Sequence, residues 1–84
     1  MALAWKDANE LAVLAAEKAD DRRLSMPERE RWFLISERVN EGRETTADLV
    51  AVAQLARVDA TLQRDAKVAA RYRALADRAL AGHR

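Results

Sequence analysis

The stretch RVDATLQRDAKVAARYRALADR, residues 57–78, decides the fold, because it either continues a helix or breaks one. No glycine or proline occurs between residues 43 and 81, and strong helix formers such as alanine, leucine and arginine dominate that segment. Thr45 or Thr46 can cap its start. The pattern predicts one long C-terminal helix over about residues 46–81, with a length of about 52 Å at the usual rise per residue.

The apolar residues of this segment follow a heptad pattern that favours a continuous helix. The seam comprises Val52, Leu55, Val58, Leu62, Ala69, Tyr72, Ala76 and Leu80. Asp59 and Thr61 are poor interior residues and good caps, so a break over residues 58–61 is the alternative, and it would permit a compact bundle. Because Val58 and Leu62 keep the seam in phase, we expect a continuous helix in which Asp59 contacts an arginine of another helix.

Two shorter helices are expected before the long one. Apolar residues recur at helical spacing over residues 2–23, which predicts a first helix there. The second is expected over residues 26–40, because Ser25 can cap its start and Gly42 is a natural left-handed stop. With 84 residues, the chain is expected to form one all-α domain, residues 1–84. The predicted fold is a helical hairpin or a small three-helix bundle with a long C-terminal helix.

The WFLI stretch, residues 32–35, argues for assembly with a second chain. Successive helical residues point about 100° apart, so these four large apolar side chains go right round the helix. A long hairpin would also be only two helices thick and would bury little. We therefore predict a homodimer with Trp32, Phe33 and Leu34 at the assembly interface. The alternative leaves Leu34 as a lone exposed apolar residue.

Arginine recurs every seven residues along the predicted long helix, at Arg57, Arg64, Arg71 and Arg78. These residues fall at the most exposed heptad position, where charge is expected for solubility alone. None of them has an acidic residue three or four positions away, and arginine side chains suit the carboxylates or phosphates of a partner. The stripe therefore predicts either a solvated face, paired with acids of the first two helices, or a binding site. The candidate partner-binding residues are Arg57, Arg64, Lys67, Arg71 and Arg78.

Residue types that carry catalysis are scarce in this sequence. Cysteine is absent, and the one histidine, His83, lies next to the last residue. Ser25 and Ser36 have no histidine base within the folded body. Three carboxylates cluster near the end of the first helix, and a solvated acidic end is favoured there over a Mg²⁺ or Ca²⁺ site; they are Glu17, Asp20 and Asp21. We expect no enzyme activity, no cofactor, no metal site and no small-molecule substrate.

The hydropathy pattern contains no membrane span, because no apolar run approaches the ~20 residues that a span needs. The start of the chain lacks the basic flank and apolar core of a signal peptide. We therefore expect a cytoplasmic protein without membrane contact. The bias toward alanine and arginine is compatible with a GC-rich bacterial or phage genome. The net charge of +1 implies no particular partner.

The stretch TTADLVAVAQLARVDATLQRDAK, residues 45–67, resembles the helix-turn-helix of bacterial repressors. The residues that match its first helix are Val52, Ala53, Leu55 and Ala56, and those that match its recognition helix are Thr61, Leu62, Arg64 and Asp65. The turn glycine is absent and the turn is several residues too short, so no family is assigned.

Two functions follow from these observations. We expect a small non-enzymatic regulatory or adaptor protein that acts by protein–protein binding through helical surfaces, with itself and with another protein. The alternative is a DNA-binding transcriptional regulator that uses the basic face of the C-terminal helix on phosphates. A steep loss of affinity with salt would distinguish the second from the first.

Overall fold

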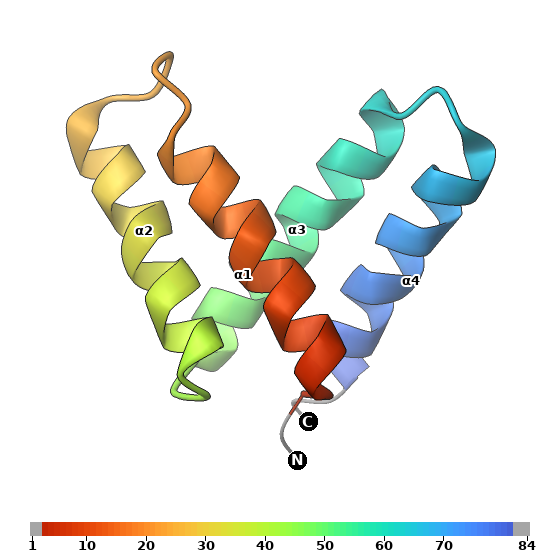
Figure 1. Ribbon diagram of the computed structural model, residues 1–84, viewed down its shortest axis with the longest axis horizontal. Helices are drawn as coiled ribbons and strands as arrows, with labels where there is room; N and C mark the ends of the chain where they lie inside the picture. The colour runs from red at the N-terminus through yellow and green to blue at the C-terminus, as the bar shows by residue number, and fades with distance from the viewer. Residues whose placement is uncertain (1–2, 82–84) are drawn as a thin grey trace.

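The computed structural model describes residues 3–81 of the chain, which fold into four α-helices. The helices are α1 (Trp5–Ala19), α2 (Met26–Asn40), α3 (Thr46–Leu62) and α4 (Ala66–Ala81). They pack as two hairpins, α1 with α2 and α3 with α4, and the hairpins lean apart like the arms of a V (Figure 1). The prediction of an all-α fold is confirmed.

The predicted continuous C-terminal helix is wrong. Helix α3 ends at Leu62, and Gln63 has an extended backbone, with φ −80° and ψ 134°. Asp65 then starts α4, because its carboxylate accepts a hydrogen bond from the backbone N–H of Lys67 at 2.8 Å. The break lies at residues 63–65, just after the alternative position that the sequence suggested.

This break decides the overall shape. A helix of about 52 Å is replaced by two shorter ones that fold back on each other. The molecule measures 32 × 32 × 17 Å with a radius of gyration of 12.1 Å. The predicted long hairpin or three-helix bundle is therefore replaced by four helices in a compact globule, and each helix gains neighbours from its own chain.

Helix α1 is shorter than predicted, because it stops at Ala19 rather than near residue 23. The backbone N–H of Asp20 closes the last turn, and the carboxylate of Asp21 accepts a hydrogen bond from the N–H of Arg23 at 3.0 Å. Aspartate side chains compete with helical hydrogen bonds in this way. The guanidinium of Arg29 also donates to the carbonyl of Ala19 at 2.8 Å, which satisfies an otherwise free helix end.

The predicted bounds of the second helix, residues 26–40, are confirmed. The hydroxyl of Ser25 accepts a hydrogen bond from the N–H of Glu28, as the cap requires. Gly42, which follows the C-cap residue Glu41, takes a left-handed conformation with φ +73°. Within the hairpin, the hydroxyl of Ser36 donates to the carbonyl of Ala12 at 2.7 Å.

A partly buried ion pair joins the end of α2 to the start of α3. Thr45 and Asp48 form a reciprocal capping box, in which each side chain accepts from the other residue's backbone N–H. Arg38 donates to both carboxylate oxygens of Asp48, at 2.7 and 2.8 Å. Because Asp48 is buried, this bidentate contact fixes the angle at which the second hairpin leaves the first.

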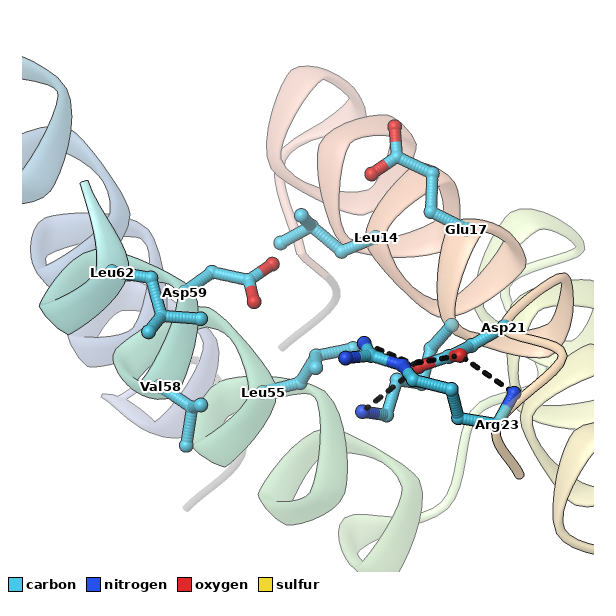
Figure 2. Close-up of a pocket in the computed structure, with 9 residues that line it drawn as sticks. Leu14, Glu17, Asp21, Arg23, Leu55, Val58, Asp59 and Leu62 are labelled. Carbon is cyan, nitrogen blue, oxygen red and sulfur yellow. Dashed lines mark hydrogen bonds and ion pairs between the residues drawn. The ribbon is translucent and has the colours of Figure 1, made fainter.

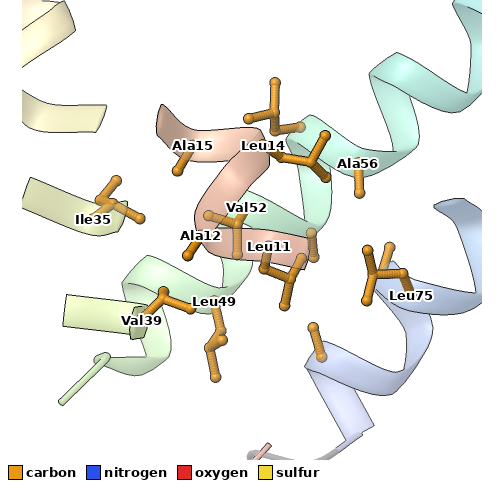
Figure 3. Close-up of a cluster of buried hydrophobic side chains, with 14 residues drawn as sticks. Leu11, Ala12, Leu14, Ala15, Ile35, Val39, Leu49, Val52, Ala56 and Leu75 are labelled. Atoms are coloured by element: carbon orange, nitrogen blue, oxygen red, sulfur yellow. The ribbon is translucent and has the colours of Figure 1, made fainter. Parts of the chain in front are cut away.

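The core lies where α1 crosses α3, near the closed end of the V (Figure 3). The largest fully buried side chains are Leu11, Val39, Leu49, Val52 and Leu75. Leu14, Ile35 and Leu55 are also buried, and alanines fill most of the remaining core positions, where their small size lets the helices approach closely. Full burial of each large apolar side chain contributes roughly 1.5–3 kcal/mol. The described part of the chain contains no helix that is both long and apolar enough to cross a membrane.

Candidate functional site

A cleft opens between the arms of the V, where the C-terminal halves of α1 and α3 diverge (Figure 2). Its volume is about 220 Å³. The residues that line it are Leu14, Glu17, Lys18, Asp21, Arg23, Leu55, Val58, Asp59 and Leu62. The cleft is therefore built from two helices of different hairpins and depends on the tertiary arrangement.

Three apolar residues of α3 form a stripe along one wall, which we call the α3 stripe: Leu55, Val58 and Leu62. Their spacing of three and four residues places them on one helix face. The exposed fraction rises along the stripe, from 8% at Leu55 to 55% at Val58 and 73% at Leu62. The sequence predicted these residues as part of a buried seam, but the seam leaves the core within two helical turns.

A second hollow of about 270 Å³ continues the same surface on the other side of Val58. Trp32 of α2 lines it together with Val58 and Leu55. Val58 thus lines both hollows, and its side chain is accessible from both. The apolar surface extends in this way from α3 across to the first hairpin.

At one end of the cleft, three charged side chains form ion pairs with one another: Lys18, Asp21 and Arg23. The guanidinium of Arg23 donates to both carboxylate oxygens of Asp21 at 3.0 Å, and the ammonium of Lys18 lies 3.9 Å from the same carboxylate. The hydrogen bonds from Arg23, together with the Lys18 charge, lower the pKa of Asp21 to about 2. Asp21 is therefore ionised at neutral pH, and both nearby cations already have a partner.

The other acidic groups of the cleft have no such partner. Asp59 makes no hydrogen bond or ion pair with any residue in the described part of the chain, so the predicted contact with an arginine of another helix is wrong. Partial burial raises the pKa of Asp59, and the charge of Lys18 opposes this only in part. Glu17, on the α1 side, is exposed and likewise unpaired among residues 3–81. Two carboxylates in the cleft thus lack a hydrogen bond or ion pair among residues 3–81, and the Lys18 charge offsets only part of the cost at Asp59.

The predicted arginine stripe is divided by the break and largely paired with acids of other helices. Arg57 of α3 lies 3.0 Å from Asp77 of α4. Two arginines of α4 reach α1: Arg71 donates to Glu10 at 2.7 Å, and Arg78 donates to both carboxylate oxygens of Asp7 at 2.9 and 3.0 Å. These acids are distant in sequence, which is why spacing within one helix did not reveal them.

Arg64 and Lys67 differ from the other stripe residues. Both are exposed at the turn between α3 and α4, and neither side chain forms an ion pair within the described residues. The proposed partner-binding set therefore consists of three arginines that hold helices together and two cations that face solvent.

The residues expected at an assembly interface point in three directions. Trp32 is half-buried, packs against the core and lines the second hollow. Phe33 is 51% exposed and lines, together with Met26, a shallow hollow between α2 and the end of α1. Leu34 is 44% exposed on a further face. One surface cannot cover all three side chains.

The two serine hydroxyls that the sequence raised as catalytic candidates have structural partners. The hydroxyl of Ser25 caps α2, and that of Ser36 donates to α1. Among residues 3–81, no group of three or more histidine, cysteine, aspartate or glutamate side chains is arranged to hold a metal ion. His83 lies outside the described residues.

Comparisons with known proteins add no family to this description. A scan of protein-family models and searches of curated proteins and of solved structures found no match to this chain.

Proposed function

We propose that this protein is a small non-enzymatic adaptor or regulator that holds a helix of a partner protein in the cleft between its two hairpins. The observation that carries the proposal is the exposure of the α3 stripe, which rises to 73% at Leu62 in a helix that is otherwise well buried on that face. Amphipathic helices dock in apolar grooves through side chains at this spacing.

Exposure of the α3 stripe lowers the stability of the free protein, and this supports a role of the stripe in binding. Burying side chains of this size is worth roughly 1.5–3 kcal/mol each, and the domain forgoes most of that at Val58 and Leu62. Contiguous apolar surface in a concave site is typical of interaction sites, whereas scattered single residues are not. Trp32, which lines the adjoining hollow, is a residue type enriched at binding hot spots.

The DNA-binding alternative has less support. The break does separate α4 from α3, but three of the five candidate partner-binding cations form ion pairs with Asp7, Glu10 and Asp77. Only Arg64 and Lys67 remain for phosphates from that set. This alternative predicts a weak affinity for duplex DNA of any sequence that falls steeply as salt is added.

Titration with a model helix tests the proposed function directly. The probe is a helical peptide of about 18 residues, with leucines at helical spacing along one face and glutamines elsewhere. Two-dimensional NMR should show shifts of the Val58 and Leu62 methyl groups and of the Trp32 indole N–H. The variant with Val58→Ser and Leu62→Ser should weaken binding by at least about tenfold, since two anchors are lost.

A matched control removes apolar groups of similar exposure elsewhere. Val13 and Val50 are 47% and 40% exposed, and neither lines the cleft. The variant with Val13→Ser and Val50→Ser should bind the peptide as the natural sequence does. Shifts that gather around Met26 and Phe33 instead, or equal loss of binding in both variants, would contradict the proposal.

We also propose that the protein self-associates weakly through the face of α2 that carries Met26 and Phe33. The fourth helix removes the need for a second chain to thicken a thin hairpin, so the proposal now rests on Met26 and Phe33, which lie two turns apart on one helix face. Light scattering over a dilution series should show a mass above 9.4 kDa only at high concentration. Phe33→Glu should restore the monomer mass at all concentrations, and a monomer mass throughout for the natural sequence rejects this interface.

A further inference from the structure

The charges that surround the α3 stripe indicate which kind of helix the cleft accepts. Five charged residues line the cleft: three are acidic, and two, Lys18 and Arg23, are basic. Both basic groups bind Asp21. The remaining acidic groups, Glu17 and Asp59, are therefore the only charged lining residues without a hydrogen bond or ion pair among residues 3–81, and the charge of Lys18 offsets that of Asp59 only in part.

The two free carboxylates stand on different walls of the cleft. Asp59 projects from α3 toward α1, and Glu17 extends from α1 on the other side of Leu14 (Figure 2). A ligand between the stripe and α1 would have Asp59 beside it on α3 and Glu17 beside it on α1. Asp59 is half-buried, so a ligand that leaves it unpaired would deepen its desolvation, and a cation placed beside it would relieve that penalty.

Building on the proposed function, we propose that the partner of this cleft is a cationic amphipathic helix, with an apolar face against Leu55, Val58 and Leu62 and lysine or arginine on both flanks beside Glu17 and Asp59. The stripe runs from residue 55 to residue 62, about 10 Å along α3, so the contact covers about two turns of the partner helix. An anionic helix would place like charges against the unpaired carboxylates, which disfavours it.

A pair of charged model peptides tests the charge of the partner separately from the cleft itself. Both are about 18 residues long with the same leucine face, and the flanking positions are lysine in one and glutamate in the other. At low ionic strength the lysine peptide should bind about tenfold more tightly, because two partly exposed charge pairs change sign between the peptides. The preference should shrink as salt is added.

Two charge-matched double variants locate the source of the preference. Glu17→Gln with Asp59→Asn should reduce it to less than about twofold. The control variant, Glu30→Gln with Glu37→Gln, changes the net charge by the same amount on α2, and neither residue lines the cleft. This variant should keep most of the preference for the lysine peptide. An equal or larger loss in the α2 variant would overturn the assignment to Glu17 and Asp59.

The remaining outcomes separate the two proposals. If both peptides perturb Val58 and Leu62 with equal affinity, or the glutamate peptide binds more tightly, the cleft stands as a helix site and the cationic partner is rejected. If neither these peptides nor the glutamine peptide perturbs the stripe, the proposed function fails, and the charge inference falls with it.

Discussion

The two halves of α3 have similar apolar patterns and opposite surroundings. In the first half, Leu49, Val52 and Ala53 are fully buried against α1 and its neighbours. In the second half, Val58 and Leu62 continue the pattern but face the open cleft. The difference teaches that heptad spacing specifies a helix face, while burial of that face depends on whether another helix is present beside it.

Two aspartates of α3 show the same contrast in electrostatics. Asp48, at the closed end, is held by Arg38 and by the N–H of Thr45, and these hydrogen bonds lower its pKa despite its burial. Asp59, at the open end, has no hydrogen bond among residues 3–81, and partial burial raises its pKa. Folding therefore favours the ionised form of Asp48 and the protonated form of Asp59.

The largest expected difference between the two halves is in core packing. Leu49→Ala should lower the free energy of unfolding by about 2–5 kcal/mol, because it leaves a cavity among fully buried neighbours. Leu62→Ala should change it by less than about 0.5 kcal/mol, since that side chain already faces solvent. Urea unfolding followed by circular dichroism measures both. If Leu62→Ala lowers the free energy of unfolding by more than about 1 kcal/mol, the stripe is buried in the free protein.

A smaller difference is expected when the aspartates are compared. Asp48→Asn keeps a side chain that can cap α3 but removes the charge that binds Arg38, so it should cost about 1–2 kcal/mol at neutral pH. Because the pKa of Asp48 is lowered in the folded state, its contribution is present above the ordinary value of 3.8 and is lost as the pH falls through the lowered value. The cost of Asp48→Asn should therefore shrink below about pH 4.

Asp59→Asn is the matched control for Asp48→Asn. Its expected effect on the free energy of unfolding is the smallest of these and has the opposite sign. Its folded-state pKa is raised, so its stabilising contribution is present below 3.8 and is lost as the pH rises through the folded value. At neutral pH the substitution should raise the free energy of unfolding by roughly a few tenths of a kcal/mol. This gain should vanish in acid, where Asp59 is protonated. Unfolding curves at several pH values check both variants. A loss of stability at neutral pH would mean that Asp59 has an attractive partner.

The residues of the cleft were visible in the sequence, but their arrangement was not. The seam pattern identified Leu55, Val58 and Leu62 as apolar positions of one face. Asp59 stood out as a poor interior helix residue, and Glu17 belonged to an acidic group at the end of the first helix. The arginine pairs show the same limit, because Arg78 binds Asp7 from the opposite end of the chain. No spacing rule within one helix can reveal such a pair.

The sequence by itself determined the helical class and the local ends of helices, since a cap involves only a few neighbouring residues. The Ser25 cap, the left-handed Gly42 and the Thr45 cap of α3 were all readable in this way. Only the tertiary structure decided that the chain turns back after Leu62. The apolar seam fits both a straight and a folded helix, and the folded form gains close packing of α3 on α4 and the contacts of Arg71 and Arg78 with α1. That gain comes from segments far apart in the chain, so local propensity could not disclose it.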